Sequence, residues 1–167
     1  VIVISIGNET EMTPDCKTNY HIQKNLSLNE SRIKIKNYEK LSDLNLLKKC
    51  NVIIDSILGT GVIGELKQPF QSIINSLNKF DCYKVAIDIP TGLNADTGFG
   101  ENIFNADLTI TLGEFKKGLF IQDGYTNCGD TVKSYIGLGF SFFDRFETDE
   151  YLIEPEDVYN YLPVKSK

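Results

Sequence analysis

The sequence has a single histidine and no excess of basic residues, and these absences exclude some kinds of function. Its 17 Lys and Arg residues are outnumbered by 23 Asp and Glu residues, which gives a formal net charge of −6. We expect no nucleic-acid partner, because no basic stripe exists to displace the counterions of a phosphate backbone. The single histidine, His21, excludes any mechanism that combines a histidine base with a second histidine. We expect His21 on the surface of a helix that follows Pro14.

Long hydrophobic runs and paired cysteines are also missing. No apolar run approaches the roughly 20 residues that cross a bilayer, and no signal peptide is visible, so we expect no membrane partner. The cysteines are widely separated and form no C-x-x-C pair, which argues against a disulfide framework or a zinc site. We expect reduced thiols, most of them packing residues, in a cytoplasmic protein: Cys16, Cys50, Cys82 and Cys128.

Apolar runs of strand length alternate with helical patterns along the 167 residues. This length suits one α/β domain. We predict strands at 1–6, 32–35, 52–54, 85–87 and 108–111, with shorter ones near Leu119, Val132 and Tyr151. We predict helices at 15–28, 38–50 and 69–77. The first run is of the kind that is buried on both faces of a parallel sheet. The predicted fold class is α/β, a Rossmann-like three-layer α/β/α arrangement with one mostly parallel sheet.

Two consecutive predicted strands end on an aspartate, Asp55 and Asp88, and a loop containing glycine follows each of them. In a parallel sheet the ligand lies outside the carboxyl ends of the strands. The two aspartates are therefore the first candidates for a functional site.

The loop after Asp55 contains Gly59, Gly61 and Gly64 in a G-x-G-x-x-G pattern. A dinucleotide fingerprint begins its helix within the glycines, whereas Pro69 predicts a later helix start here. Glycines let backbone N–H groups approach a phosphate closely, so a phosphate cradle is one interpretation. A plain glycine turn is the other.

The loop after Asp88 continues Ile-Pro-Thr-Gly and would direct Asp88 and Thr91 into the crevice. Asp88 can serve as a general acid/base, and Thr91 can offer its oxygen to a hard cation or to the substrate. The alternative is that Asp88 caps its own turn. Lys116 could meet a phosphate, but a solvated loop lysine is the commoner case. We interpret Phe140, Phe142, Phe143 and Phe146 as core or interface residues.

Four motifs in this order resemble the NAD(P)H-hydrate epimerases, which also form the amino-terminal half of bifunctional nicotinamide-nucleotide repair enzymes. They are D-S-I-L-G-T-G, V-A-I-D-I-P-T-G-L-N-A-D-T-G, A-D-L-T-I-T-L-G-E-F-K-K-G-L and Y-I-G-L-G. The resemblance runs from about residue 1 to 139, and the second string is highly specific.

The resemblance implies that the protein interconverts the R and S epimers of NADHX and NADPHX. It implies a potassium ion bound by Asp55 and Thr91, and Asp88 as a substrate contact that we take as the catalytic residue. It places the remaining substrate-binding residues in one segment: Gly59, Thr60, Gly61, Val62, Ile63, Gly64 and Glu65.

The resemblance also bears on the organisation of the chain. The family's N-N-G-G-D-G loop would precede the first strand, and this sequence lacks it. We expect residues 1–150 to be an epimerase-like domain without its first βα unit. Residues 151–167 are expected to be a linker toward a dehydratase domain that uses ATP or ADP.

Other functions stay open at this point. One is a non-catalytic nucleotide-binding module of the same fold. Another is a nicotinamide-dependent dehydrogenase, which would need a catalytic Tyr-x-x-x-Lys motif or a suitable histidine. The sequence leaves open whether the chain forms homo-oligomers.

Overall fold

The structure, a computed structural model, describes residues 1–61, 64–138, 140–148 and 150–161. The chain divides into two units, Val1–Ile136 and Gly137–Lys167. The units are described separately.

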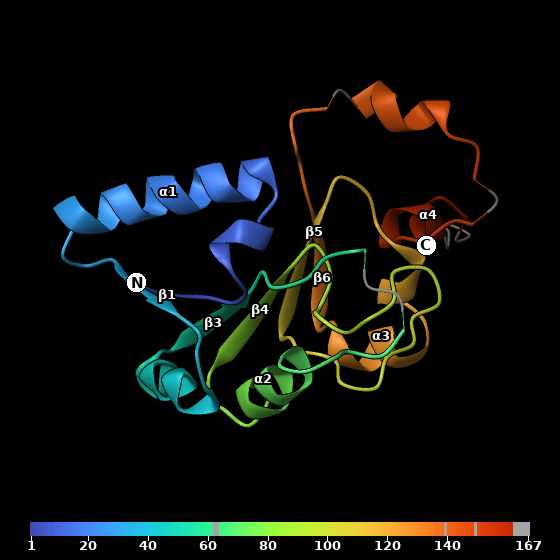
Figure 1. Ribbon diagram of the computed structural model, residues 1–167. Coiled ribbons are helices and arrows are strands. Elements are labelled where there is room, and N and C mark those ends of the chain that lie inside the picture. Colours follow the sequence, from blue (N-terminus) through green and yellow to red (C-terminus); the bar gives the residue numbers. More distant parts are fainter. Residues whose placement is uncertain (62–63, 139, 149, 162–167) are drawn as a thin grey trace, which may run out of the picture. The chain divides into compact units, whose positions relative to one another are not determined.

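The first unit alternates strands and helices (Figure 1). Its strands are β1 (Ile2–Ser5), β2 (Lys34–Asn37), β3 (Val52–Asp55), β4 (Tyr83–Ile87), β5 (Leu108–Leu112) and β6 (Asp130–Ser134). Its α-helices are α1 (Pro14–Asn29), α2 (Phe70–Leu77) and α3 (Gln122–Asn127). Three 3₁₀ segments join them: η1 (Glu9–Glu11), η2 (Leu41–Lys49) and η3 (Lys117–Leu119). The predicted α/β class with parallel strands is confirmed.

The parallel strands belong to two hydrogen-bonded sheets, so the prediction of one sheet is wrong. β1 pairs with β2, and the other four strands follow the order β3-β4-β5-β6. Apolar periodicity indicates that a segment is a strand but does not identify its neighbour. β1 still packs on the shared core, since Ile4 contacts the cluster that contains Leu44 and Ile53.

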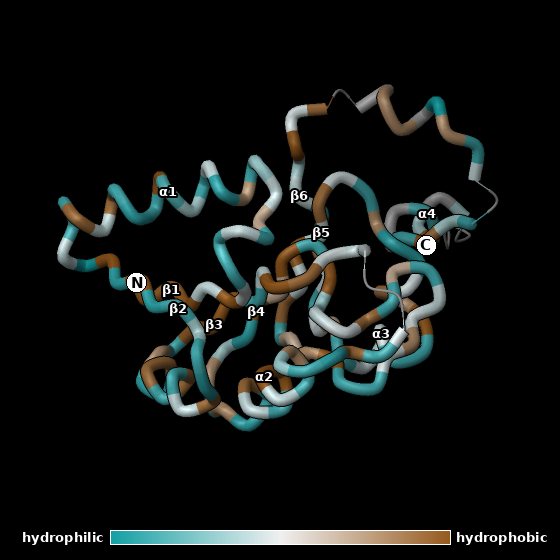
Figure 2. Tube along the Cα trace, viewed as in Figure 1, coloured by the Kyte–Doolittle hydropathy of each residue, from teal (hydrophilic) through white to brown (hydrophobic). Residues whose placement is uncertain are grey.

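The four-stranded sheet buries one face. Helix α2 covers this face with the buried side chains of Ile73, Ile74 and Leu77. Hydrophobic residues along this helix are drawn in brown in Figure 2. On the opposite face large apolar side chains are exposed: Val52, Ile54, Tyr83, Leu112 and Val132. The first strand also departs from its prediction, because all four residues of β1 are half-buried rather than buried on both faces.

Several element predictions are wrong in detail. The strand predicted near Leu119 is the 3₁₀ segment η3, because the adjacent Gly118 N–H donates to Ala95 O at 2.6 Å and ties the backbone to a loop instead of a sheet. The helix predicted over 38–50 is the shorter 3₁₀ helix η2. Helix α1 begins at Pro14, one residue before the predicted start, and Thr13 accepts a hydrogen bond there from the amide of Cys16.

The second unit contains the 3₁₀ helix η4 (Phe140–Arg145) and the helix α4 (Pro155–Tyr161), which forms where a linker was expected. The strand predicted near Tyr151 is absent, since that residue has no regular structure. Phe142 packs edge-on against Phe143, with ring centroids 5.3 Å apart, and also contacts Phe146.

The prediction of a surface histidine agrees with the structure, whereas only two of the four cysteines, Cys82 and Cys128, pack in a core cluster. All four cysteines are free; Cys128 is buried and Cys16 is exposed. His21 lies on the exposed side of α1, where its Nε2 is 2.7 Å from Glu9 Oε1. Among the described residues no helix has the length and apolar character to cross a membrane.

Candidate functional site

The carboxyl ends of β3 and β4 bring Asp55 and Thr91 into direct contact. Asp55 is the last residue of β3, and its neighbour in the β4 register is Ala86. The Thr91 hydroxyl donates to Asp55 Oδ1 at 2.8 Å, and the Thr91 amide donates to Oδ2 at 2.8 Å. Both side chains are buried, with exposed fractions of 1% for Asp55 and 0% for Thr91. The two predicted metal ligands therefore form one buried pair.

Burial raises the pKa of Asp55, and the hydrogen bonds from Thr91 and Ile57 oppose that rise. No charged side chain contributes to the shift. The Ile57 amide donates to Asp55 Oδ1 at 3.1 Å, which makes an Asx turn at Asp55. Within the described part of the chain, the buried carboxylate is thus held by neutral donors, and no cationic side chain compensates its charge.

The Asp55–Thr91 pair lies among further oxygens. The Thr91 hydroxyl oxygen accepts from the Leu58 amide at 3.1 Å and lies 3.4 Å from the Leu58 carbonyl oxygen. Carboxylate, hydroxyl and carbonyl oxygens are the donors that hard cations prefer. Within the described ranges no group of three or more His, Cys, Asp or Glu side chains gathers around a point. The donor set fits a potassium ion, whose charge would compensate the buried carboxylate.

Gly92 fixes the loop that carries Thr91. Its φ of +96° lies in the left-handed region, which favours glycine. A Cβ at this position would overlap the carbonyl oxygen of Asn102 and lie 2.9 Å from Leu66 Cδ1. The backbone after β4 is therefore packed closely against residue 102.

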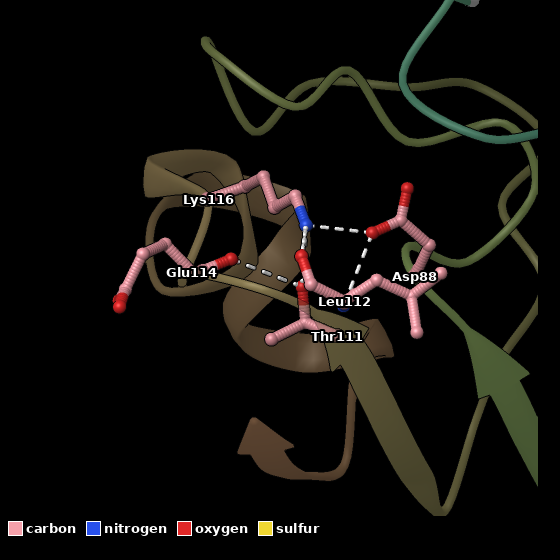
Figure 3. Close-up of polar contacts among 5 residues, drawn as sticks. All are labelled: Asp88, Thr111, Leu112, Glu114 and Lys116. Carbon is pink, nitrogen blue, oxygen red and sulfur yellow. Dashed lines mark hydrogen bonds and ion pairs between the residues drawn. The ribbon is translucent and has the colours of Figure 1, made fainter. Parts of the chain in front are cut away.

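Asp88 follows β4 with a left-handed φ of 71°, which is unusual for a residue with a side chain. Its Oδ1 accepts from Lys116 Nζ at 2.6 Å and from the Leu112 amide at 3.3 Å (Figure 3). Both side chains are mostly buried, at 20% exposed for Asp88 and 21% for Lys116. In the part of the chain that the structure describes, no donor to the carboxylate comes from the loop after Asp88. The interpretation that Asp88 caps its own turn therefore has no support here.

The glycine segment after β3 is an exposed turn separated from the next helix. Helix α2 starts at Phe70, so the three glycines Gly59, Gly61 and Gly64 lie outside the first turn of the helix that follows them. Gly59 lies beside Asp88, since an added Cβ would be 3.5 Å from Asp88 Oδ2. Thr60 and Glu65 are exposed, and Val62 and Ile63 lie outside the described residues. Of the predicted substrate-binding segment, the structure thus brings Gly59 next to Asp88.

Lys116 is the site residue that sequence reasoning missed. The prediction of a solvated loop lysine is wrong, because Lys116 is mostly buried and paired with Asp88. The available signal was its position just after β5, the third strand that ends at the same edge of the sheet. The Tyr-x-x-x-Lys spacing does occur, in Tyr20 and Lys24 of α1. However, Tyr20 donates to Asn37 Oδ1 at 2.9 Å at the end of β2, and Lys24 pairs with Glu9.

The chain belongs to the family described as YjeF-related protein N-terminus, which matches residues 1–118. A crystal structure of yeast ynu0 has the same fold, with a TM-score of 0.65 and 22% identity over 93% of this chain and 63% of the yeast chain.

Two curated relatives carry functional names. The chain is 36% identical over 123 residues to the bifunctional NAD(P)H-hydrate repair enzyme Nnr of Coxiella burnetii. The aligned stretch covers 73% of this chain and 25% of that protein. The chain is 43% identical over 91 residues to the NAD(P)H-hydrate epimerase of Nitrosopumilus maritimus, which covers 54% of this chain and 41% of that protein. The chain therefore spans well under half the length of either relative.

Proposed function

We propose that this chain carries the epimerase site for NAD(P)H hydrate, interconverting the R and S forms of NADHX and NADPHX. The observation that carries the proposal is the Asp88 carboxylate at the carboxyl end of β4, beside Gly59 and anchored on Lys116. A relative named NAD(P)H-hydrate epimerase, at 43% identity, and one named bifunctional NAD(P)H-hydrate repair enzyme, at 36%, support it.

The chemistry of the substrate matches a carboxylate at this position. C6 of the hydrated ring carries a hydroxyl group and the ring nitrogen, so it is a hemiaminal-type carbon. Inversion requires either loss of that hydroxyl group or opening of the ring, followed by return from the other face. Both routes need a group that gives and takes a proton at the C6 oxygen. Asp88 is the candidate for that group.

We further propose a potassium ion bound by the Asp55 carboxylate and the Thr91 hydroxyl group. The support is a buried carboxylate whose raised pKa has no cationic side chain to oppose it. When bound, the ion would supply a positive charge that organises the two loops near the substrate phosphates. Compensating a buried charge is favourable, which gives the ion a role in stability as well.

We also propose that the complete protein contains a dehydratase domain that acts on the same substrate. The Coxiella burnetii relative is named as a bifunctional repair enzyme, and this chain matches 25% of its length. An epimerase in the same polypeptide would supply the epimer that the dehydratase consumes.

Asp88→Asn in the complete protein tests the proposed function. Asparagine keeps the shape and tolerates a left-handed backbone, but it cannot shuttle a proton. We expect the variant to fold and bind substrate while epimer exchange falls about 100-fold or more. The assay starts from one pure epimer and follows the appearance of the other.

Asp96→Asn is the matched control, because Asp96 is an exposed aspartate in the same loop. It should exchange epimers at the rate of the native protein. If Asp88→Asn also does so, Asp88 has no part in the chemistry.

A further inference from the structure

Lys116 reaches Asp88 from the loop after β5, and its ammonium group makes hydrogen bonds to acceptors on two segments. Nζ lies 2.6 Å from Asp88 Oδ1, 3.0 Å from Thr111 Oγ1 and 2.7 Å from the Leu112 carbonyl oxygen (Figure 3). A lysine ammonium has three N–H donors. All of them have partners within the protein, so Lys116 has no donor left for a substrate phosphate.

The same contacts fix which oxygen of Asp88 is available. Oδ1 accepts from Lys116 and from the Leu112 amide, and the Leu112 carbonyl oxygen in turn accepts from Lys116. Oδ2 faces Gly59, where an added Cβ would be 3.5 Å away. No hydrogen bond to Oδ2 is found among the residues that the structure describes. One oxygen of Asp88 is therefore anchored and the other is directed at the glycine turn.

Among the described residues, two other carboxylates at this edge of the sheet have partners of their own. Glu114 turns toward Lys133, whose Nζ lies 3.3 Å from Glu114 Oε2. The Asp55 carboxylate is bonded to Thr91. Lys116 is thus the charged group that orients Asp88, across a gap of 28 positions in sequence.

We propose that Lys116 is a positioning residue that holds Asp88 Oδ1, so that Oδ2 is the oxygen that exchanges the proton with the substrate. This inference rests on the proposed function of Asp88. The left-handed backbone of Asp88 makes the anchor necessary, because such a conformation persists where surrounding contacts enforce it.

The test compares Lys116→Met with Lys116→Arg in the complete protein. Methionine keeps most of the length of the side chain and removes the charge and the donors. We expect kcat to fall about 10- to 100-fold, the loss typical of a misplaced catalytic group, with little change in KM. Arginine keeps the charge and several donors, so it should recover part of kcat. Lys79→Met, a change of an exposed lysine on the loop before β4, should leave both constants unchanged.

A double variant separates positioning from an independent role. In the Asp88→Asn background, Lys116→Met should add little further loss, because the residue acts through Asp88. A full additional loss in that background, or a raised KM with unchanged kcat in the single variant, would overturn the proposal in favour of direct substrate binding by Lys116.

An NMR measurement makes the outcome independent of activity. The Leu112 amide donates to Asp88 Oδ1, so its proton shift should change in Lys116→Met if Asp88 swings away. An unchanged shift would overturn the proposal even if kcat falls. A native protein without epimerase activity would instead refute the proposed function, and the Leu112 shift would still decide whether Lys116 holds Asp88.

Discussion

Replacing Gly92 by alanine should destabilise the loop that holds Thr91 against Asp55. Gly92 has a φ of +96°, and an added Cβ would overlap the carbonyl oxygen of Asn102. The left-handed backbone costs about 1–2 kcal/mol for a residue with a Cβ. Overpacking against fixed neighbours adds about 1–3 kcal/mol. We expect the free energy of unfolding to fall by about 2–5 kcal/mol.

Two other glycines separate these contributions. Gly7 has a φ of +99° and nothing within 4 Å of an added Cβ, so Gly7→Ala should lose only the backbone part, about 1–2 kcal/mol. Gly61 also has open space and no left-handed φ, so Gly61→Ala should change stability by about 0.5 kcal/mol or less. The three variants therefore form a graded series.

Urea unfolding of the three variants, followed by circular dichroism, measures the series. The m-value should stay constant if the folded and unfolded states keep their compactness. A midpoint for Gly92→Ala equal to that of Gly61→Ala would refute the reasoning, because it would mean that the loop yields to the added methyl group at no cost.

Two further predictions concern the buried groups. Replacing sodium ions by potassium ions at constant ionic strength should raise the Tm of the complete protein, because an ion that binds the folded state stabilises it. Asp55→Asn should abolish that rise. If the variant still shows it, Asp55 is not a ligand of the ion. Burial raises the pKa of Cys128 to about 11, so in the folded protein a thiol reagent should modify exposed Cys16 quickly and Cys128 only after unfolding. The stability linked to Cys128 is present below the unfolded thiol pKa of about 8.5 and is lost as pH rises toward 11. As pH rises from about 8.5 toward 11, the free energy of unfolding should therefore fall less for Cys128→Ala than for the native protein.

Much of the fold follows from local sequence patterns. The apolar runs of β3, β4 and β5 predicted these strands, and Pro14 predicted the start of α1. Each of these signals depends on neighbouring residues, so it can be seen in one stretch of sequence. The division into two sheets depends on which strand edges meet, and no local pattern encodes that.

The candidate site could likewise be predicted only in part from the sequence. Asp55 and Asp88 were singled out because each directly follows an apolar run of strand length. Thr91 was singled out from its loop as a contact for a cation or the substrate, and the resemblance assigned it to a potassium ion. The Lys116–Asp88 contact was missed because it joins two loops and depends on the backbone angle of Asp88. The position of Lys116 just after β5 was the available signal, but a solvated lysine can occupy the same place in a sequence.

Two opposing effects act on stability at position 88: the backbone conformation disfavours a side chain, and the contact with Lys116 favours the carboxylate. At a φ of 71° a glycine relieves strain of about 1–2 kcal/mol that aspartate must bear. Asp88→Gly would release that strain, but it would also leave the mostly buried ammonium group of Lys116 without its carboxylate partner. A stabilised version of this chain would therefore have to keep Asp88 together with Lys116 and gain its stability at other positions.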